Sequence, residues 1–430
     1  MALSVGPARP AHDRRRRIHP AWGVAAVAFL ALIGAAGFRA APGALMVPLH
    51  QEFGWSTSVM SLAVSINLLL YGLTAPFAAA LMDRFGIRQV VAGALTLVAL
   101  GAGGSVLMTA SWQLLVFWGV LIGLGTGSMA LVFAAAITNR WFHRRRGLVM
   151  GVLTAGSATG QLIILPIVAL LAETVGWRPA SLVIAAAAMA VVPVAWLVIR
   201  DRPEDRGALP YGADTSYVAP APVTGGATRR ALEGLAFASR QRSFWALAAA
   251  FAICGATTNG LVGIHFIPSA HDHGMSGTTA AGLLAVVGIF DIAGTVASGW
   301  LTDKFDPRIL LAAYYFFRGV GLLMLPQLLA ETVHPSMVLF IVVYGLDWVA
   351  TVPPTAALCR EIFGERGTIV FGWVFASHQV GAAIAALGAG VVRDTFGTYT
   401  YAWWGGAAMC VLAAVLSMAV RVARADAVTP

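Results

Sequence analysis

The sequence predicts an all-α membrane protein with twelve transmembrane helices, arranged as two related halves of six helices each. Three observations support this. Hydrophobic residues make up 59% of the chain and charged residues only 11%, whereas a soluble protein carries about a quarter charged residues. Apolar runs of about twenty residues, long enough to cross a bilayer as helices, follow one another from Trp22 to Val420. Several loop motifs also recur 220 residues further along the chain.

Each apolar run is expected to form one helix, because a helix satisfies its own backbone polar groups inside lipid. The predicted spans cover residues 21–47, 56–82, 89–110, 112–139, 147–172, 178–199, 243–270, 277–302, 309–328, 335–359, 367–392 and 399–421. The first run is long and has no convincing cleavage site, so we expect a retained helix rather than a signal peptide. Cys254, Cys359 and Cys410 occur singly and are expected to be packing residues.

The recurring motifs lie in the loops between spans. The hexapeptide at 83–88 returns at 303–308, and Arg140 and Arg146 return as Arg360 and Arg366. A repeat in register over half the chain indicates a duplicated bundle, and such bundles place a substrate site between their halves. We therefore predict an N-terminal tail (1–20), a first half (21–199), a linker (200–242), a second half (243–421) and a C-terminal tail (422–430).

The basic residues are distributed unevenly. Of 28 Lys and Arg residues, 24 lie in the two tails and in the loops that follow even-numbered spans. This bias predicts that both termini are cytoplasmic, and it explains the net charge of +9 without nucleic acid. In the linker, residues 228–242 are predicted to form an amphipathic helix on the membrane surface.

The repeated hexapeptide resembles the loop signature that the major facilitator superfamily carries after its second and eighth helices. The resemblance covers residues 21–421 and implies that family's pseudo-twofold fold of six plus six helices. An Asp at a helix end and an Arg one turn further on can pair with each other and with a neighbouring helix end. We predict that such a conformational latch is formed by Asp83, Arg84, Arg88, Asp303, Lys304 and Arg308.

A second stretch gives a narrower resemblance. The aromatic pair Trp141-Phe142, the basic cluster 143–146 and the small residues that follow up to Gly156 resemble the signature that opens the fifth helix of monocarboxylate porters. The same stretch resembles the bacterial oxalate/formate antiporter branch, and its basic residues also fit cytoplasmic topology alone. The Gly-Pro motif of many proton-coupled drug exporters is absent. The resemblance implies transport of a carboxylate.

Ionisable residues inside a span are costly, so each is a candidate functional residue. Counting about 1.5 Å per residue from the nearest loop places Asp291, Arg318, Asp347 and His378 roughly 15–20 Å deep, near the midplane. Alternating-access carriers bind substrate at this depth.

Substrate binding is assigned first to Arg39, because a buried guanidinium presents a planar fork to a carboxylate. The alternative is that Arg39 reaches the outer headgroups. By resemblance, Arg39 and His378 occupy substrate-contacting positions of the oxalate/formate branch; His378 could equally be a packing residue. The repeat offset adds Asn259, equivalent to Arg39, and Tyr71, equivalent to Asp291, and Trp348 in the tenth span could form a stacking wall.

Proton coupling is assigned to Asp291, Arg318 and Asp347. Asp291 resembles the eighth-helix Asp of monocarboxylate porters, where an Arg follows four residues later; here that position is Thr295. Arg318 on the next helix lies at matching depth and could replace the missing cation. The alternative is a static structural pair between Asp291 and Arg318.

These assignments predict a proton-coupled symporter of small organic monocarboxylates in a bacterial inner membrane, acting as a monomer without a cofactor. The main alternative is an organic-anion antiporter, followed by a drug or metabolite exporter. A sensor would be expected to carry an extra soluble domain, and an intramembrane enzyme would need a nucleophile–base or metal-ligand set. The sequence offers neither, so we expect a transporter rather than an enzyme.

Overall fold

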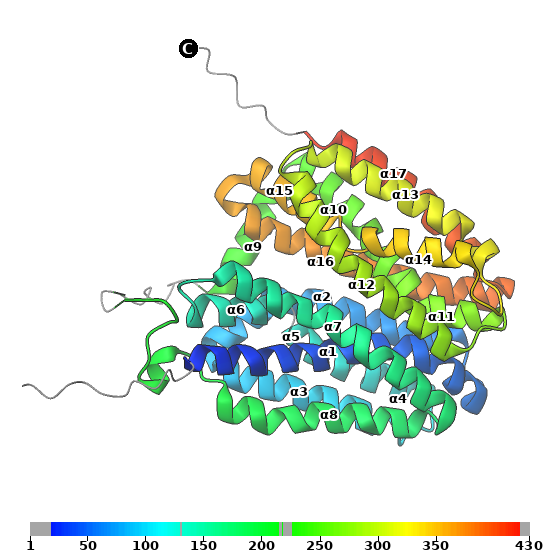
Figure 1. Ribbon diagram of the computed structural model, residues 1–430, viewed down its shortest axis with the longest axis horizontal. Coiled ribbons are helices and arrows are strands. Elements are labelled where there is room, and N and C mark those ends of the chain that lie inside the picture. Colours follow the sequence, from blue (N-terminus) through cyan, green and yellow to red (C-terminus); the bar gives the residue numbers. More distant parts are fainter. Residues whose placement is uncertain (1–18, 130, 215–216, 218–225, 422–430) are drawn as a thin grey trace, which may run out of the picture.

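The computed structural model describes residues 19–129, 131–214, 217 and 226–421. Two layers of long helices form an elongated molecule, with α1–α8 in one layer and α10–α17 in the other (Figure 1). Successive spans run in opposite directions along the long axis. We call the end that holds the start of α1 and the end of α17 the terminal end, and the other end the distal end.

The first layer is the N-terminal half. Its helices are α1 (Pro20–Phe53), α2 (Thr57–Phe85), α3 (Ile87–Ser105), α4 (Ser111–Leu114), the π-helical η1 (Leu115–Ile122), α5 (Gly123–Ser128), α6 (Leu131–Trp141), α7 (Arg146–Thr174) and α8 (Trp177–Val198). The segments from α4 to α6 together form the fourth span. A 3-10 turn, η2 (Pro203–Arg206), opens the linker, and α9 (Ala227–Ala238) closes it.

The second layer is the C-terminal half. It comprises α10 (Arg242–Gly255), the π-helical η3 (Ala256–Val262), α11 (Gly263–Asp272), α12 (Gly277–Thr302), α13 (Pro307–Leu328), α14 (Pro335–Asp347), α15 (Val352–Phe363), the 3-10 turn η4 (Gly364–Arg366), α16 (Gly367–Phe396) and α17 (Thr400–Ala419). The seventh span is continuous from α10 to α11. The tenth span, predicted as one helix over 335–359, is instead interrupted between α14 and α15.

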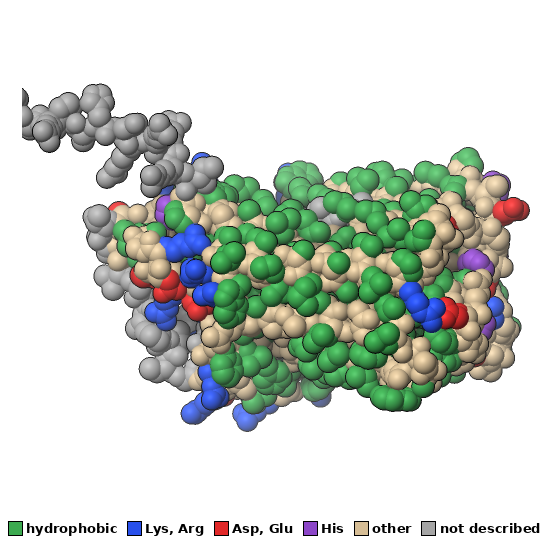
Figure 2. Space-filling model, turned by 90° about the horizontal axis from the view of Figure 1, so that it is seen from below, with side chains coloured by type: hydrophobic (Ala, Val, Ile, Leu, Met, Phe, Trp, Pro, Cys, Tyr) green, Lys and Arg blue, Asp and Glu red, His purple; other side chains and the backbone are tan. Residues whose placement is uncertain are grey.

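The predicted membrane-spanning character is confirmed. Within the described residues, 11 helical segments are long and apolar enough to cross a bilayer. The remaining predicted span corresponds to α7, a helix of 29 residues. Hydrophobic side chains cover the middle of the molecule and charged side chains gather towards its two ends (Figure 2). The first span is longer than predicted, because α1 continues to Phe53.

The buried apolar core is shared by the two halves at one end of the molecule and separate at the other end. At the distal end, one cluster draws on both halves, with Leu45 and Met46 of α1 in the same cluster as Ile264 and Phe266 of α11. At the terminal end, one further cluster takes its buried residues from the N-terminal half, and another from the C-terminal half together with Ala238 of the linker. The two halves are therefore joined by shared apolar packing at the distal end.

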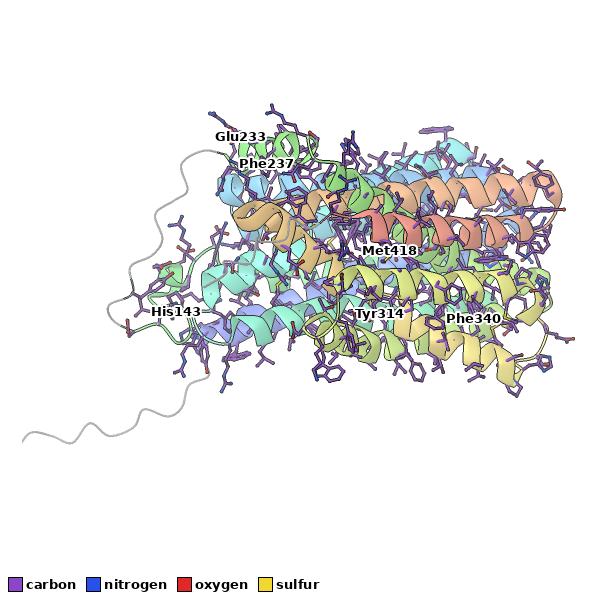
Figure 3. All side chains as sticks on the ribbon, turned by 90° about the horizontal axis from the view of Figure 1, so that it is seen from above. His143, Glu233, Phe237, Tyr314, Phe340 and Met418 are labelled. Carbon is purple, nitrogen blue, oxygen red and sulfur yellow. The ribbon has the colours of Figure 1, made fainter. Side chains whose placement is uncertain are left out.

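The linker helix α9 packs against protein. It lies at the terminal end, where Figure 3 labels its Glu233 and Phe237, and it contacts α2 of one half and α16 of the other. Trp373 Nε1 donates a hydrogen bond of 2.8 Å to the carbonyl of Ala231, and Phe237 joins the C-terminal cluster. The linker helix therefore bridges the two halves, and its place on the membrane surface stays a prediction.

Candidate functional site

The interruption of the tenth span is the central feature of the site. Pro353 and Pro354 begin α15, and proline has no backbone N–H to donate to the carbonyl four residues earlier. The carbonyl of Ala350, which loses its helical donor to Pro354, accepts a hydrogen bond of 2.5 Å from the Ser298 hydroxyl on α12. In the middle of this span, backbone polar groups without a helical partner can therefore bind side chains of neighbouring helices.

Arg318 on α13 is bound at this interruption. Its Nε donates to Asp347 Oδ2 at 2.6 Å and its Nη2 to the Asp347 carbonyl at 2.6 Å, while its Nη1 donates to Cys254 Sγ at 3.0 Å. The side chains of Arg318 and Asp347 are 0% and 7% exposed. A buried guanidinium is tolerated here because its N–H groups point at a carboxylate, at the last carbonyl of α14 and at a thiol.

Asp291 on α12 approaches the same interruption from the other side. Its Oδ1 accepts hydrogen bonds from Thr295 Oγ1 at 3.0 Å and from the backbone N–H of Val349 at 3.1 Å. The three residues assigned to proton coupling therefore meet around one helix break. The ion pair, however, joins Arg318 to Asp347 rather than to Asp291. Among the described residues, Asp291 forms no salt bridge.

An apolar cavity of about 230 Å³ adjoins the Arg318–Asp347 pair. Its wall is formed by α13 and α14, including Met324, Leu339 and Phe340; Figure 3 shows Phe340 on α14 and Tyr314 on α13. Met324 and Leu339 are more than half exposed on the outer surface of the bundle. The cavity therefore faces sideways between two helices and does not lie between the two halves.

An aromatic row connects the two halves. The ring of His378 stacks on Phe375 with centroids 5.7 Å apart and packs against Phe251 at 4.9 Å. Phe375 also packs against Tyr71 of α2, in the other half. Two predicted substrate residues, Tyr71 and His378, are thus linked through Phe375.

The seventh span lies between His378 and the Arg318–Asp347 pair. Cys254 on that span contacts Arg318, while the next residue, Gly255, lies so close to α16 that an added Cβ would be 1.8 Å from the carbonyl oxygen of His378. Only glycine permits this approach.

Trp348 and Asn259 belong to the same region. Trp348 follows Asp347 directly, is partly buried, and packs edge-on against Tyr344 with centroids 5.7 Å apart. Asn259 is partly buried in η3, a π-helical segment of the seventh span. π-helical segments inside longer helices are frequent at functional sites.

Arg39 belongs to α1, and only its backbone is described; its side chain is outside the described part of the structure. Its assignment to anion binding therefore stays a prediction. The side chain of Asp83 is likewise outside the described residues.

The other predicted latch residues contact their own halves and, for Arg88, also the linker residue Asp201. The backbone N–H of Arg88 donates to Asp201 Oδ1 at 3.2 Å, and its guanidinium lies 4.0 Å from the centroid of Trp196. Arg84 lies over Phe85, and Lys304 lies over Trp300 at 3.8 Å.

In the second copy of the motif, Arg308 pairs with Asp306 at 2.6 Å, while Asp303 is exposed. The Arg308 side chain lowers the pKa of the Asp306 carboxyl through a hydrogen bond. The predicted latch is not closed across the halves by the residues that are described.

Three residues of this region were not among the predicted site residues. Cys254 and Thr295 bind the predicted charged residues directly, although Cys254 was expected only to pack. Gln379 on α16 is 1% exposed, and among the described residues neither of its amide atoms has a hydrogen-bond partner. Its position beside His378 in a predicted span was the available signal.

Comparisons with known proteins agree with the architecture. The sequence profile described as Major Facilitator Superfamily matches residues 25–370 and 265–429. An uncharacterized MFS-type transporter of Bacillus subtilis, YcxA, is 26% identical over 391 residues, covering 87% of this chain and 88% of that protein. Monocarboxylate transporter 11 of Mus musculus is 28% identical over 395 residues, covering 88% of this chain and 82% of the transporter.

Two solved structures share the fold. The inward-open xylose transporter XylE from E. coli matches with a TM-score of 0.69 at 14% identity, covering 94% of this chain and 98% of XylE. A bacterial homologue of the human lysosomal transporter Spinster, in an inward-facing and unoccupied conformation, matches with a TM-score of 0.67 at 16% identity, covering 95% of this chain and 96% of that chain.

Proposed function

Because this chain belongs to the Major Facilitator Superfamily and has the transporter fold of that family, we propose that it moves small organic monocarboxylates together with protons by alternating access. The observation that carries the proposal is the arrangement of Asp291, Arg318 and Asp347 around the broken tenth span. Similarity to monocarboxylate transporters over most of the chain supports the substrate class.

The direction of the molecule in the membrane follows from its charges. Lys and Arg residues are concentrated in the tails and in the loops of the terminal end, so the terminal end faces the cytoplasm. Apolar packing joins the halves at the distal end and is divided at the terminal end. In this proposal the shared apolar packing closes the outer side of the molecule, and the halves part on the cytoplasmic side when substrate is released.

In this proposal, Asp291 carries the proton. Its carboxyl group is buried, accepts hydrogen bonds from Thr295 and Val349, and has no cation in direct contact among the described residues. A buried carboxyl without a counter-charge binds a proton more readily than Asp347, which is held in an ion pair with Arg318. Protonation of Asp291 would weaken its acceptor role towards Val349, which couples the proton to the helix break.

Substrate binding keeps the residues assigned from the sequence. Arg39 provides the positive charge for the carboxylate, and Tyr71, His378 and Trp348 provide aromatic surface and hydrogen-bonding groups, with Asn259 on the seventh span. A single cation for the substrate fits a monocarboxylate better than a dicarboxylate. The substrate's charge would then be balanced by the co-transported proton.

Uptake into proteoliposomes tests the proposal. The purified protein is reconstituted, and accumulation of labelled lactate, pyruvate, acetate, benzoate and oxalate is measured with and without an inward proton gradient. We expect gradient-driven accumulation of at least one monocarboxylate, and loss of the gradient dependence in Asp291→Asn. Glu233→Gln, an exposed acid on α9, is the matched control and should behave as the parent protein.

The other outcomes each reject a part of the proposal. Exchange that ignores the gradient would make the protein an organic-anion antiporter. Unchanged gradient dependence in Asp291→Asn would remove that residue from the proton path. If none of the compounds is transported, the carboxylate assignment is wrong.

A further inference from the structure

At the distal end, the first turns of two helices are capped by carboxylates that come from the opposite half of the molecule. The first backbone N–H groups of a helix have no partner within the helix and carry partial positive charge. A carboxylate placed there forms charge-assisted hydrogen bonds, and here each such contact joins one half to the other.

The first contact joins α2 to the end of α16. Asp394 Oδ1 accepts from the backbone N–H of Thr57 at 3.1 Å, and its Oδ2 accepts from the backbone N–H of Ser58 at 2.7 Å. The Ser58 hydroxyl also donates to Oδ2 at 2.5 Å. Gly390, one turn before Asp394, allows the close approach, since an added Cβ would lie 2.4 Å from Ser61 Oγ.

The second contact joins α12 to the end of α7. Glu173 Oε1 accepts from the backbone N–H of Thr278 at 2.9 Å, and the Thr278 hydroxyl donates to Glu173 Oε2. Gly277 is the first residue of α12, and an added Cβ there would lie 2.8 Å from Glu173 Oε1.

The capped helix starts of the two contacts are related by the internal repeat, while the two carboxylates are 221 residues apart (394 − 173). Each capped helix has its own N-cap serine, Ser56 for α2 and Ser276 for α12, and these serines are 220 residues apart. Ser58 and Thr278 are separated by the same offset. Each serine side chain accepts a hydrogen bond from the backbone N–H three residues later in the chain. The start of each helix is therefore capped by a serine of its own half and by a carboxylate of the opposite half.

We propose that Asp394 and Glu173 form a two-fold pair of latches that holds the distal gate closed, and that both contacts must break when the transporter opens at this end. The contacts cross between the halves at the same end as the shared apolar core, and a rotation of one half against the other separates each carboxylate from its helix. The inference depends on the family assignment and not on the proposed substrate.

Two other carboxylates at the distal end supply a comparison. Glu52 pairs with Arg178 at 2.6 Å, and Asp272 pairs with Arg393 at 2.7 Å. Both pairs lie within a single half, so rotation of the halves leaves them intact. Loss of Glu52 removes the same charge from the same end without touching a contact between the halves, whereas loss of Asp272 would free Arg393, the residue directly before Asp394.

Distance measurements between spin labels test the latches. Thr109 and Val333 are exposed in distal loops of the two different halves, and Thr109→Cys with Val333→Cys provides the labelling sites, since Cys254, Cys359 and Cys410 are buried. Distance distributions are recorded by double electron–electron resonance on the full chain in lipid nanodiscs. The variants are Asp394→Asn, Glu173→Gln, their combination, and the control Glu52→Gln.

We expect each latch variant to raise the ratio of long to short distances by roughly 2- to 30-fold, the range for one carboxylate at a helix N-terminus, with a larger change in the combination. Thr278→Val, which keeps both carboxylates and removes one hydroxyl, should shift the ratio less and in the same direction. Distributions that match the parent in both single variants and in the combination would overturn the proposal. An equal shift in Glu52→Gln would also overturn it, because surface charge and not the latches would then control the gate.

Discussion

The buried ion pair of Arg318 and Asp347 leads to a quantitative prediction about the thermal stability of the protein. Replacing Asp347 with Asn keeps the shape of the side chain and leaves the guanidinium of Arg318 without its counter-charge. Replacing Arg318 with Met leaves the carboxylate of Asp347 alone in the same place. The combined variant contains neither charge.

The expected magnitudes follow from burial. The two side chains are 0% and 7% exposed, so water cannot compensate the partner that remains. Breaking a buried ion pair from one side costs about 3–5 kcal/mol. For a cooperative unit of about 150–250 residues, the size range of one half, this corresponds to a fall in Tm of roughly 6–20 °C. The combined variant should be no less stable than either single variant, because no unpaired charge is left.

Thermal unfolding with a fluorogenic maleimide measures this effect, since Cys254, Cys359 and Cys410 are free and buried and react only when the protein opens. Arg229→Met, which breaks an exposed pair with Glu233 on α9, is the control and should leave Tm unchanged. Additive losses in the combined variant would refute the reasoning, because they would show that the two charges do not depend on each other.

Three further outcomes are expected. Arg39→Ala should abolish uptake while the protein is still made and folded; transport at the parent rate would reject the anion site. Gly255→Ala should destabilise the protein by about 1–3 kcal/mol, because its Cβ would meet the carbonyl of His378. Gly388 has open space around it, so Gly388→Ala should leave stability unchanged in the same thermal-unfolding assay. Because Arg308 lowers the pKa of Asp306, that carboxylate contributes stability above its usual pKa of about 3.9 and loses it as pH falls through the lowered value. The Tm difference between the parent and Asp306→Asn should therefore be present at pH 7 and disappear in strong acid; a difference independent of pH would contradict this.

The aromatic pair of the fifth-helix signature shows how a sequence motif can have a structural task. Trp141 and Phe142 are fully buried, and Trp141 Nε1 donates to the carbonyl of Arg200 at 3.1 Å. The Trp141 carbonyl accepts from the backbone N–H of Tyr211 at 2.8 Å. In this chain the aromatic pair therefore holds the first part of the linker against the N-terminal half.

The sequence by itself determined the membrane class, the spans and the duplication, because a bilayer requires about twenty apolar residues per helix and a repeat preserves its loops. It also placed Asp291, Arg318 and Asp347 at one depth, since depth depends only on the number of residues from a loop.

Tertiary structure decided the rest. Depth along a helix does not fix the direction in which a side chain points, so the choice of Asp347 over Asp291 as the partner of Arg318 appeared only with the packing of α12, α13 and α14. The interruption at 348–351 then supplied the backbone N–H that Asp291 binds. The two latches at the distal end depend on how one half lies against the other, and a pattern that describes each half separately contains no information about contacts between them.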